Sequence, residues 1–317
     1  MNTYHVVLVK CCATVDSPPF PGDLQFFQKS MESAGIRYDV QAWDDPDVKW
    51  ERYTHVIITS VIEYHCNIDQ FLKWVSDMKV LMMNRSTKMW NSPEVIVWNH
   101  NKKYLLELQA KNIQIPATLL VEDVKEDLSL WLERRLGMFE RNGRVVVKDI
   151  IGAAGTSVWV SNLIRTKDGT YAMPPSDLKR LSQQIQVSNG VLIQEYLPTI
   201  LDEGEWSLIY FNNMFSHAVL KKPSGYSCDK LEIRVHCTYG GTFQPVEQKH
   251  VPLEVLQFGD RVMSLFSEPL LHARVDILNS QDGEPCLLEF EVLDPCLYQT
   301  EAIHGEQYLK ALLNISN

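Results

Sequence analysis

The sequence lacks the short motifs that mark the commonest nucleotide-binding and redox proteins. No GxGxxG follows the first strand-like segment, Tyr4–Val9, so a Rossmann dinucleotide site has no support. No lysine follows the second glycine of Gly152–Ser157, which excludes a Walker A loop. The seven cysteines are odd in number and show no CxxC spacing, which favours reduced thiols in a cytosolic protein over disulfides or a zinc site. The cysteines are Cys11, Cys12, Cys66, Cys228, Cys237, Cys286 and Cys296.

A basic excess and a long apolar run are also missing. The formal net charge of −10 argues against a broad interface with a phosphate backbone, so we expect no nucleic-acid partner. No apolar run approaches the length of a bilayer span, and the N-terminus is too short and uncharged at its start for a secretory signal. We therefore expect no membrane partner and a cytoplasmic location. The neighbours His65-Cys66 and His236-Cys237 would point to opposite faces of a strand and are not expected to chelate a metal.

The first hundred residues alternate between strand-like and helix-like patterns, which predicts a parallel, doubly wound sheet. Strands are expected at 4–9, 36–42, 55–59 and 80–82, and helices at 23–34 and 69–78. Open α/β sheets bind ligands at the carboxyl ends of their strands. Glu63 and His65, just after the third strand, are therefore substrate-pocket candidates, although an ordinary capped strand end is an equal interpretation.

From about residue 142 the pattern changes to a small α+β unit and then to a strand-rich region. Helices at 102–111 and 125–136 and a strand at 119–121 precede that change; strands at 144–151, 158–160 and 191–196 and helices at 176–186, 253–266 and 305–313 follow it. The expected fold class is α/β and α+β. Its expected parts are an N-terminal parallel α/β domain (1–99), connecting helices (100–141), a small lid subdomain (142–196) and a C-terminal antiparallel-sheet subdomain (197–317).

Three acids gather on a hairpin expected between His272 and Pro295. Both arms alternate with a period of two around an Asp-Gly turn. Val275 and Ile277, with Leu288, Phe290 and Val292, are expected to face the core, so that Asp276, Glu289 and Glu291 crowd on the open face. Three such carboxylates repel one another unless a cation joins them, and all-oxygen ligation suits Mg²⁺ or Mn²⁺. A solvated strand face is the alternative interpretation.

The small-residue turn Gly152–Ser157 is a candidate phosphate-binding loop. Its backbone N–H groups can approach phosphate oxygens closely, and Lys148 lies on the strand that leads into it. Taken alone the signal is weak, since most glycine-rich hairpin turns are only turns.

Two later segments could contact a nucleotide or an anion. The strand that ends at Gln194–Leu197 could expose its backbone to an adenine edge, and a nearby acid could bind a ribose hydroxyl; an acidic linker is the alternative. The cations Lys221, Lys222 and Arg234 precede a Gly-Gly turn and are anion-binding candidates, with an exposed strand face as the structural interpretation.

In their order along the chain, these segments resemble the ATP-grasp superfamily. The resemblance spans nearly the whole chain and implies an ATP-grasp fold with ATP and Mg²⁺ (or Mn²⁺) as cofactors. It assigns Asp276, Glu289 and Glu291 to the metal and Arg274 to catalysis. Its nucleotide-binding residues are Lys102, Lys148, Gly152, Gly155, Thr156, Ser157, Gln194, Glu195, Tyr196, Leu197 and Glu205. Spacing from Asn99 favours Lys102 over Lys103 for phosphate contact.

Within that superfamily the chain looks most like the branch of the prokaryotic glutathione synthetases and the cyclo-ligase of cycloserine biosynthesis. The similar segments are Trp43–Asp47, Asn99–Leu106, Gly204–Leu208, Phe215–Val219 and Leu288–Glu291. Many family members have Asn where this chain has Glu291, whereas the cyclo-ligase-like branch has Glu. This difference makes glutathione synthesis the less favoured activity.

The resemblance implies a carboxylate–amine or cyclising ligase that acts through an acyl phosphate on an amino-acid-like or small peptide substrate. Arg234 and Lys222 would hold a substrate carboxylate. The expected partners are small carboxylate and amine substrates, and a homodimer through the N-terminal domain is compatible with the sequence. A small-molecule kinase on the same fold and a non-catalytic nucleotide-binding protein are the alternatives.

Overall fold

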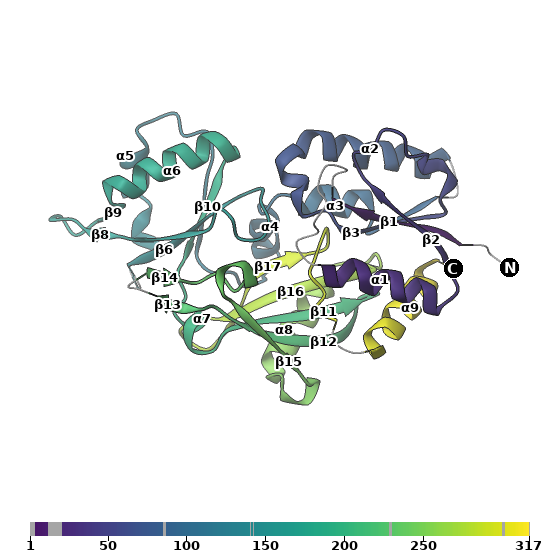
Figure 1. Ribbon diagram of the computed structural model, residues 1–317. Helices are drawn as coiled ribbons and strands as arrows, with labels where there is room; N and C mark the ends of the chain where they lie inside the picture. The colour runs from purple at the N-terminus through teal and green to yellow at the C-terminus, as the bar shows by residue number, and fades with distance from the viewer. Residues whose placement is uncertain are drawn as a thin grey trace.

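Two four-stranded sheets and one five-stranded sheet form the framework of the protein (Figure 1). The computed structural model describes residues 4–11, 21–84, 87–139, 141, 143–227, 230–299 and 302–316. The first sheet is built from strands between His5 and Trp90, the second from strands between Thr118 and Glu195, and the third from strands between Glu205 and Glu291. They are called here the N-terminal, lid and C-terminal sheets. The expected mixture of a parallel α/β part with antiparallel sheets is confirmed.

The N-terminal sheet is parallel throughout, with the order β2-β1-β3-β4. Its strands are β1 (His5–Lys10), β2 (Arg37–Ala42), β3 (His55–Ser60) and β4 (Lys88–Trp90). The helices of this part are α1 (Pro21–Ser33), α2 (Ile68–Asn84) and α3 (Pro93–Asn99), with short 3-10 helices at Trp50–Arg52 (η1) and Ile62–Asn67 (η2). All six residues of β3 are buried, which is expected of a central parallel strand covered on both faces.

The prediction of a strand at 80–82 is wrong. These residues form the last turns of α2, and the fourth strand begins only at Lys88. Leu81 and Met82 continue the helical spacing of Val75 and Met78 and pack against the same hydrophobic cluster. A short apolar run cannot be assigned to a strand or a helix by periodicity alone, because both can be buried.

The lid sheet is antiparallel, with the order β5-β10-β6-β7. Its strands are β5 (Thr118–Val121), β6 (Arg144–Asp149), β7 (Trp159–Asn162) and β10 (Val191–Glu195). Helix α6 (Pro175–Ser188) packs on this sheet. The same stretch of the chain also contains α4 (Tyr104–Ala110), α5 (Leu128–Glu133), η3 (Leu136–Phe139) and the two-stranded ribbon of β8 (Ile164–Arg165) and β9 (Tyr171–Ala172). Strand β5 therefore joins the connecting segment to the lid.

The C-terminal sheet has the order β15-β12-β11-β16-β17, and all its pairs are antiparallel. Its strands are β11 (Glu205–Phe211), β12 (Met214–Lys222), β15 (Thr242–Val246), β16 (His272–Asn279) and β17 (Pro285–Glu291). Other elements are α7 (Thr199–Asp202), α8 (Leu253–Met263), the hairpin β13 (Gly225–Ser227) and β14 (Lys230–Glu232), and the 3-10 helices η4 (Cys237–Tyr239) and η5 (Gln248–His250). Helix α8 covers one face of this sheet in the largest hydrophobic cluster, which leaves the other face for the site.

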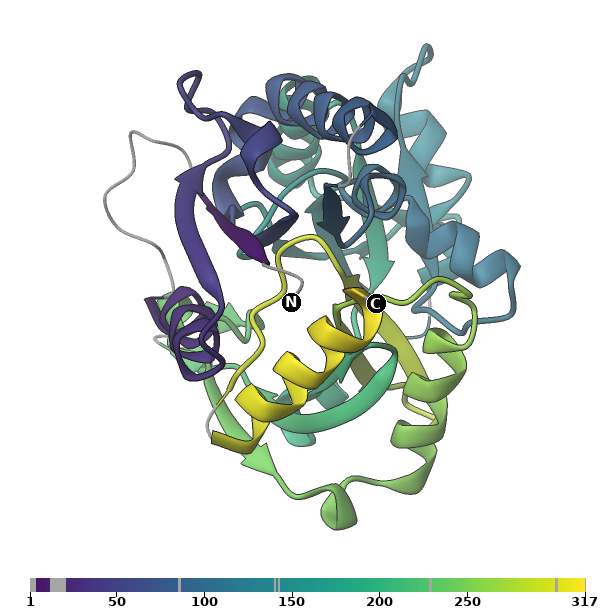
Figure 2. The ribbon, with the colours of Figure 1, turned by 90° about the vertical axis from the view of Figure 1, so that its right-hand side faces the viewer.

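The last helix, α9 (Ala302–Ser316), returns to the N-terminal domain (Figure 2). It packs beside α1, and Tyr308 and Leu312 share a cluster with Phe27 of α1 and Leu8 of β1. The two ends of the described chain thus hold the first and third parts together. Among the helices that the structure describes, none has the length and apolar character needed to cross a bilayer.

Candidate active site

A cavity lies where the three parts of the chain meet. Its walls come from β6, the glycine-rich turn and the end of β10 in the lid, from β11, β12, β16 and β17 in the C-terminal sheet, and from the residues that follow β3. The cavity therefore runs from the lid, across the face of the C-terminal sheet that α8 leaves open, to the carboxyl end of the N-terminal sheet.

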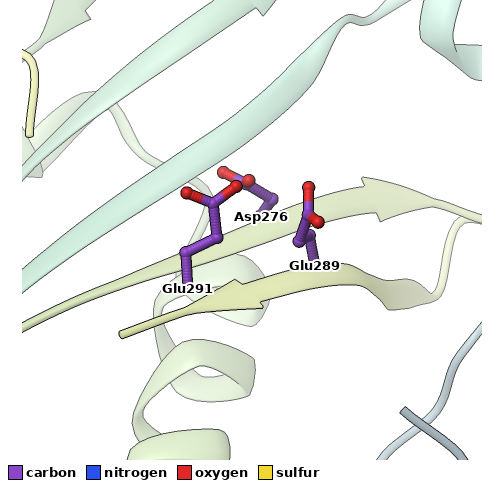
Figure 3. Close-up of side chains that lie close together, drawn as sticks. All are labelled: Asp276, Glu289 and Glu291. Carbon is purple, nitrogen blue, oxygen red and sulfur yellow. The ribbon is translucent and has the colours of Figure 1, made fainter. Parts of the chain in front are cut away.

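The three acids converge on the floor of this cavity (Figure 3). Asp276 on β16 lies opposite Glu289 on β17, and Arg274 lies opposite Glu291. One carboxylate oxygen from each of Asp276, Glu289 and Glu291 lies within 4.8 Å of the other two. In the described part of the chain, this is the one group of three such side chains close enough to hold a metal ion together. The alternation along both strands predicted this shared face.

The alternation fails at one position, Leu288. The register shifts between Asp276 and Ile277, so that Ile277 pairs with Leu287 and leaves Leu288 as an extra residue in β17. Leu287 takes the buried core position, while Leu288 lines the cavity next to Glu289. The expectation that Leu288 faces the core is therefore wrong, because a bulge lets two consecutive residues line the same side.

Two buried cations hold the acids in place. The Arg274 guanidinium donates to Asp276 through Nε (3.0 Å) and Nη2 (2.9 Å), and its Nη2 lies 2.6 Å from Glu291 Oε1. Lys221 forms ion pairs with Asp276 (3.2 Å) and Glu205. Ser207 also donates its hydroxyl to Asp276. Each buried carboxylate thus has at least one buried cation beside it, as low-dielectric surroundings require.

Burial and neighbouring charges move the pKa values of these groups apart. Burial raises the pKa of Glu291 to about 8. The positive charge of Arg274 lowers this pKa, whereas the negative charges of Glu289 and Asp276 raise it further. Burial acts in the same direction on Asp276, but Arg274 and Lys221 outweigh it and hold the pKa of that carboxyl at about 2. Burial, with Lys102 nearby, lowers the pKa of Lys148 to about 8. A divalent cation at this point would favour the ionised form of Glu291.

Two lysines reach the cavity from the lid side. Lys148 lies on β6, where Val145 and Val147 face the core of the lid and Val146 and Lys148 face the cavity. Its Nζ donates to the Leu288 carbonyl at 3.3 Å. Lys102 donates to the Gly152 carbonyl at 2.7 Å and lies 3.1 Å from Glu289.

Of the two adjacent lysines at 102 and 103, the first lines the cavity. Lys103 instead forms an ion pair with Glu122 at 2.6 Å and is more exposed to solvent. Its position agrees with the spacing argument that favoured Lys102.

The glycine-rich turn borders the cavity with its first four residues. The wall includes Gly152, Ala153, Ala154 and Gly155. Thr156 is exposed, and its hydroxyl donates a hydrogen bond to the Ala153 carbonyl. The Ser157 carbonyl accepts a hydrogen bond from Gln184 of α6. Gly155 has a φ of +65°, a conformation that favours glycine.

The end of β10 forms the apolar end of the cavity. Gln194, Glu195, Tyr196 and Leu197 all line it, together with the neighbouring Leu278 and Leu288. Gln194 is fixed by a hydrogen bond from its amide to the Thr118 hydroxyl at 2.8 Å. Glu205, at the start of β11, also lines the cavity and is paired with Lys221.

Of the four residues expected at a substrate site, Arg234 lines the cavity, whereas Lys222, Glu63 and His65 are not among its lining residues. Lys222 is exposed and donates to the Asp202 carbonyl, while the adjacent Lys221 lies in the cavity. Arg234 lines the cavity but donates to Glu232 through Nε (2.8 Å) and Nη2 (2.6 Å). After β3 the wall is formed by Ile62 and Tyr64 rather than by Glu63 and His65.

The cavity also contains Tyr64 and Asp294, which sequence reasoning did not select, and Lys221, which it gave only as one of three anion-binding candidates. Alternation along β12, counted from the buried Val219, places Lys221 on the cavity face. Tyr64 lies on a 3-10 helix, where a period of two does not apply. The same helix explains why Cys66 Sγ lies 3.7 Å from His65 Nε2, although a strand would have separated the two side chains.

No disulfide joins any two of the cysteines that the structure describes. Cys11 and Cys286 are buried, Cys66 and Cys237 are exposed and Cys296 is half-buried. Cys12 and Cys228 lie outside the described residues.

Comparison with solved structures defines the class of fold. The ATP-grasp ligase PsnB, solved with a minimal precursor, Mg and ADP, superposes with a TM-score of 0.60 at 15% identity, covering 100% of this chain and 98% of that chain. D-alanine–D-alanine ligase from Bacillus anthracis, complexed with ATP, gives a TM-score of 0.65 at 14% identity and covers 99% and 97%. The chain has the ATP-grasp fold.

A more similar relative comes from cycloserine biosynthesis. The crystal structure of D-cycloserine synthetase DcsG matches with a TM-score of 0.79 at 20% identity and covers 99% of this chain and 100% of that chain. Cycloserine biosynthesis protein DcsG of Streptomyces lavendulae is 22% identical over 306 residues, 91% of this chain and 92% of that protein. The family model of the D-cycloserine synthetase DcsG N-terminal domain matches residues 6–99. The resemblance to the ATP-grasp superfamily and to its cycloserine-biosynthesis branch is confirmed, and the expected class of ATP-grasp ligase agrees with these relatives.

Proposed function

We propose that the protein is an ATP- and Mg²⁺-dependent ligase that joins a carboxylate to an amine, or cyclises one substrate, through an acyl phosphate. The observation that carries this proposal is the convergence of Asp276, Glu289 and Glu291 on one sheet face, within 4.8 Å, beside Lys148 of the lid and Lys102 of the connecting segment. The relatives with the same fold are ligases, which supports the reaction class.

The donor set of the floor fits a hard divalent cation. Three carboxylates supply only oxygen ligands, which Mg²⁺ and Mn²⁺ prefer, and Mg²⁺ commonly binds through one or two carboxylates plus phosphate oxygens. In this proposal Asp276, Glu289 and Glu291 hold the metal. When bound, the metal would neutralise charge on the phosphates of ATP and polarise the bond to the transferred phosphoryl group.

The lid side of the cavity suits the rest of the nucleotide. Lys102, Lys148 and the backbone of residues 152–155 would contact the phosphates, and the apolar end at Gln194–Leu197 would take the adenine. Glu205 would accept a hydrogen bond from a ribose hydroxyl. Lys148, with its pKa lowered to about 8, is still mostly protonated near pH 7 and can pair with phosphate.

Phosphoryl transfer to a carboxylate requires positioning and charge neutralisation more than a protein nucleophile. Arg274 forms ion pairs with Asp276 and Glu291. From this position it would stabilise the transferring phosphoryl group and then the oxyanion that forms when the amine attacks. Arg234 would bind the substrate carboxylate by exchanging Glu232 for it. The lid turn would exclude water from the acyl phosphate.

The metal ligands provide the direct test. The double variant Glu289→Gln, Glu291→Gln keeps the shape of both side chains but removes two of the three negative charges at the floor. We expect it to lower Mg²⁺-dependent ATP turnover by about a thousandfold or more, because charge neutralisation at the phosphates supplies several kcal/mol. The readout is ADP release during a screen of amino acids and small peptides, with product masses measured.

The matched control is Glu284→Gln, an exposed acid in the turn of the same hairpin. It should turn over like the unmodified protein, and circular dichroism should show all three proteins folded. Undiminished turnover in the double variant contradicts the metal assignment. A phosphorylated substrate as final product, without a new amide bond, would favour a kinase.

A further inference from the structure

A glutamine of the lid helix α6 is hydrogen-bonded to both ends of the glycine-rich turn. The helix packs on the lid sheet through Leu178, Leu181 and Ile185, which recur with helical spacing. Gln184 lies three residues after Leu181, so it shares the face of the helix that meets the sheet, and it is half-buried there. The inference drawn from this glutamine rests on the proposed ligase function, in which the turn contacts the phosphates of ATP.

The side-chain amide of Gln184 uses all of its hydrogen-bonding groups. Its Nε2 donates to Asp149 Oδ1 at 2.6 Å and to the Ser157 carbonyl at 3.0 Å, and its Oε1 accepts from Trp159 Nε1 at 2.6 Å. The reversed amide would set its oxygen against a carboxylate and a carbonyl, so the three partners fix its orientation. A glutamate at this position would repel Asp149, and a hydrocarbon side chain would leave all three partners without a bond.

These three partners lie where the chain leaves the sheet and where it returns. Asp149 is the last residue of β6 and Trp159 is the first residue of β7. Neighbouring residues of a strand point to opposite faces, so Lys148 faces the cavity while Asp149 faces α6. Gln184 therefore joins β6, the turn and β7 from the side of the sheet that lies away from the cavity, and it is not among the residues that line the cavity.

The tip of the turn, between these two ends, offers N–H groups to a ligand. In the described part of the chain, no backbone carbonyl accepts a hydrogen bond from the N–H of Ala153, Ala154 or Gly155. Inside the tip, the Thr156 N–H donates to the Ala153 carbonyl at 3.3 Å. A short loop whose two ends are fixed has fewer conformations to lose when it binds a ligand, and this preorganisation strengthens binding.

We propose that Gln184 is a positioning residue that clamps the base of the glycine-rich turn, so that the turn presents its N–H groups to the phosphates of ATP. It acts through the turn and does not touch the nucleotide.

The test measures nucleotide binding after the clamp is removed. The full chain is titrated calorimetrically with a non-hydrolysable ATP analogue in the presence of Mg²⁺. Gln184→Leu removes the three hydrogen bonds without adding a charge and should raise the Kd by about tenfold to a hundredfold. The matched control Gln183→Leu makes the same chemical change at the neighbouring, exposed residue of α6 and should leave the Kd unchanged. Equal affinity in Gln184→Leu and the unmodified protein overturns the proposal.

A reversed pair provides a rescue. Gln184→Glu sets a carboxylate against Asp149 and should also weaken binding of the analogue by about tenfold or more. Adding Asp149→Asn lets the new amide at position 149 donate to the new carboxylate at position 184 and restores the net charge of the original pair. The double variant should bind the analogue within about threefold of the unmodified protein. Binding as weak as in Gln184→Glu alone contradicts the clamp.

Hydrogen–deuterium exchange separates positioning from general stabilisation of the lid. At concentrations of the analogue that saturate each protein, nucleotide should slow exchange in residues 150–158 of the unmodified protein and slow it about threefold less in Gln184→Leu. Exchange in residues 191–195 of β10 should be the same in both proteins. Faster exchange throughout the lid in Gln184→Leu, or equal protection of the turn, overturns the proposal.

The unmodified protein distinguishes this inference from the ligase proposal. If it fails to bind the analogue with Mg²⁺, the ligase proposal fails. If it binds the analogue and Gln184→Leu binds equally well, the ligase proposal stands and only the clamp is wrong.

Discussion

Most of the charged side chains in this cavity lie beside a side chain of opposite charge. Four buried or half-buried acids lie beside four cations. The acids are Glu205, Asp276, Glu289 and Glu291, and the cations are Lys102, Lys148, Lys221 and Arg274. Removing one partner from such a set leaves a buried charge alone, which costs more than the pair contributes.

His272 is a residue-scale feature with a consequence for acid stability. It is 1% exposed, lies between Phe27 and Tyr308, and has no hydrogen-bond partner for either ring nitrogen among the residues described. Burial lowers its pKa to about 4, whereas the unfolded chain binds the proton near pH 6.5. The contribution of neutral His272 to the free energy of unfolding is therefore fully present above pH 6.5 and is lost as the pH falls from 6.5 towards 4.

We expect the burial of neutral His272 to lower the free energy of unfolding by about 2 kcal/mol as the pH falls from 7.5 to 5, because the unfolded chain binds the proton and the folded chain does not. His272→Leu should lack that share of the pH dependence in urea unfolding. The matched control His250→Gln changes an exposed histidine and should keep the pH dependence of the unmodified protein. The same loss of stability in His272→Leu as in the unmodified protein contradicts the prediction.

At the scale of elements, the segment after β14 meets the glycine-rich turn at the edge of the cavity. Arg234 donates to the Gly155 carbonyl at 3.4 Å, and its guanidinium carbon lies 3.3 Å from the centre of the Tyr239 ring. A Cβ at Gly155 would lie 3.4 Å from Arg234 Cδ. The two segments thus meet through Arg234, whose charge is neutralised by Glu232.

If Arg234 binds the substrate carboxylate, then Glu232 competes with that carboxylate. Glu232→Gln should therefore lower the KM for the carboxylate substrate by about threefold to tenfold, with little change in kcat. Glu247→Gln, in an exposed ion pair with Lys249, is the control and should leave KM unchanged. A KM that is unchanged or higher in Glu232→Gln would show that Glu232 does not compete.

Some features of these strands and helices could be predicted from the sequence, and others could not. A period of two placed Asp276, Glu289 and Glu291 on one face, because a regular antiparallel pair leaves no other arrangement. It could not place Leu288, since a bulge depends on the pairing of two strands rather than on either strand alone. Nor could it place the end of α2, whose last turns are apolar enough for a strand.

At the scale of the whole molecule, the site depends on contacts between distant parts of the chain. The Asn99 amide donates to the Phe290 carbonyl at 2.7 Å, and Asp294 accepts from the Val61 N–H, so the N-terminal domain lies directly against β17 and the segment that follows it. No local pattern encodes such contacts, which is why Tyr64 and Asp294 were not found from the sequence. The family resemblance supplied the order of the nucleotide-binding segments, but it did not identify the residues at the far end of the cavity.

The central claim is that this cavity activates a carboxylate by transferring a phosphoryl group from ATP to it. The most direct test supplies Mg²⁺, ATP and amino acids or small peptides labelled with ¹⁸O in the carboxylate, and measures the mass of the phosphate released. An acyl phosphate that is attacked by an amine passes one carboxylate oxygen to the phosphate, so the mechanism predicts one ¹⁸O atom in each phosphate that accompanies a new amide bond. Phosphate that contains only unlabelled oxygen would contradict it.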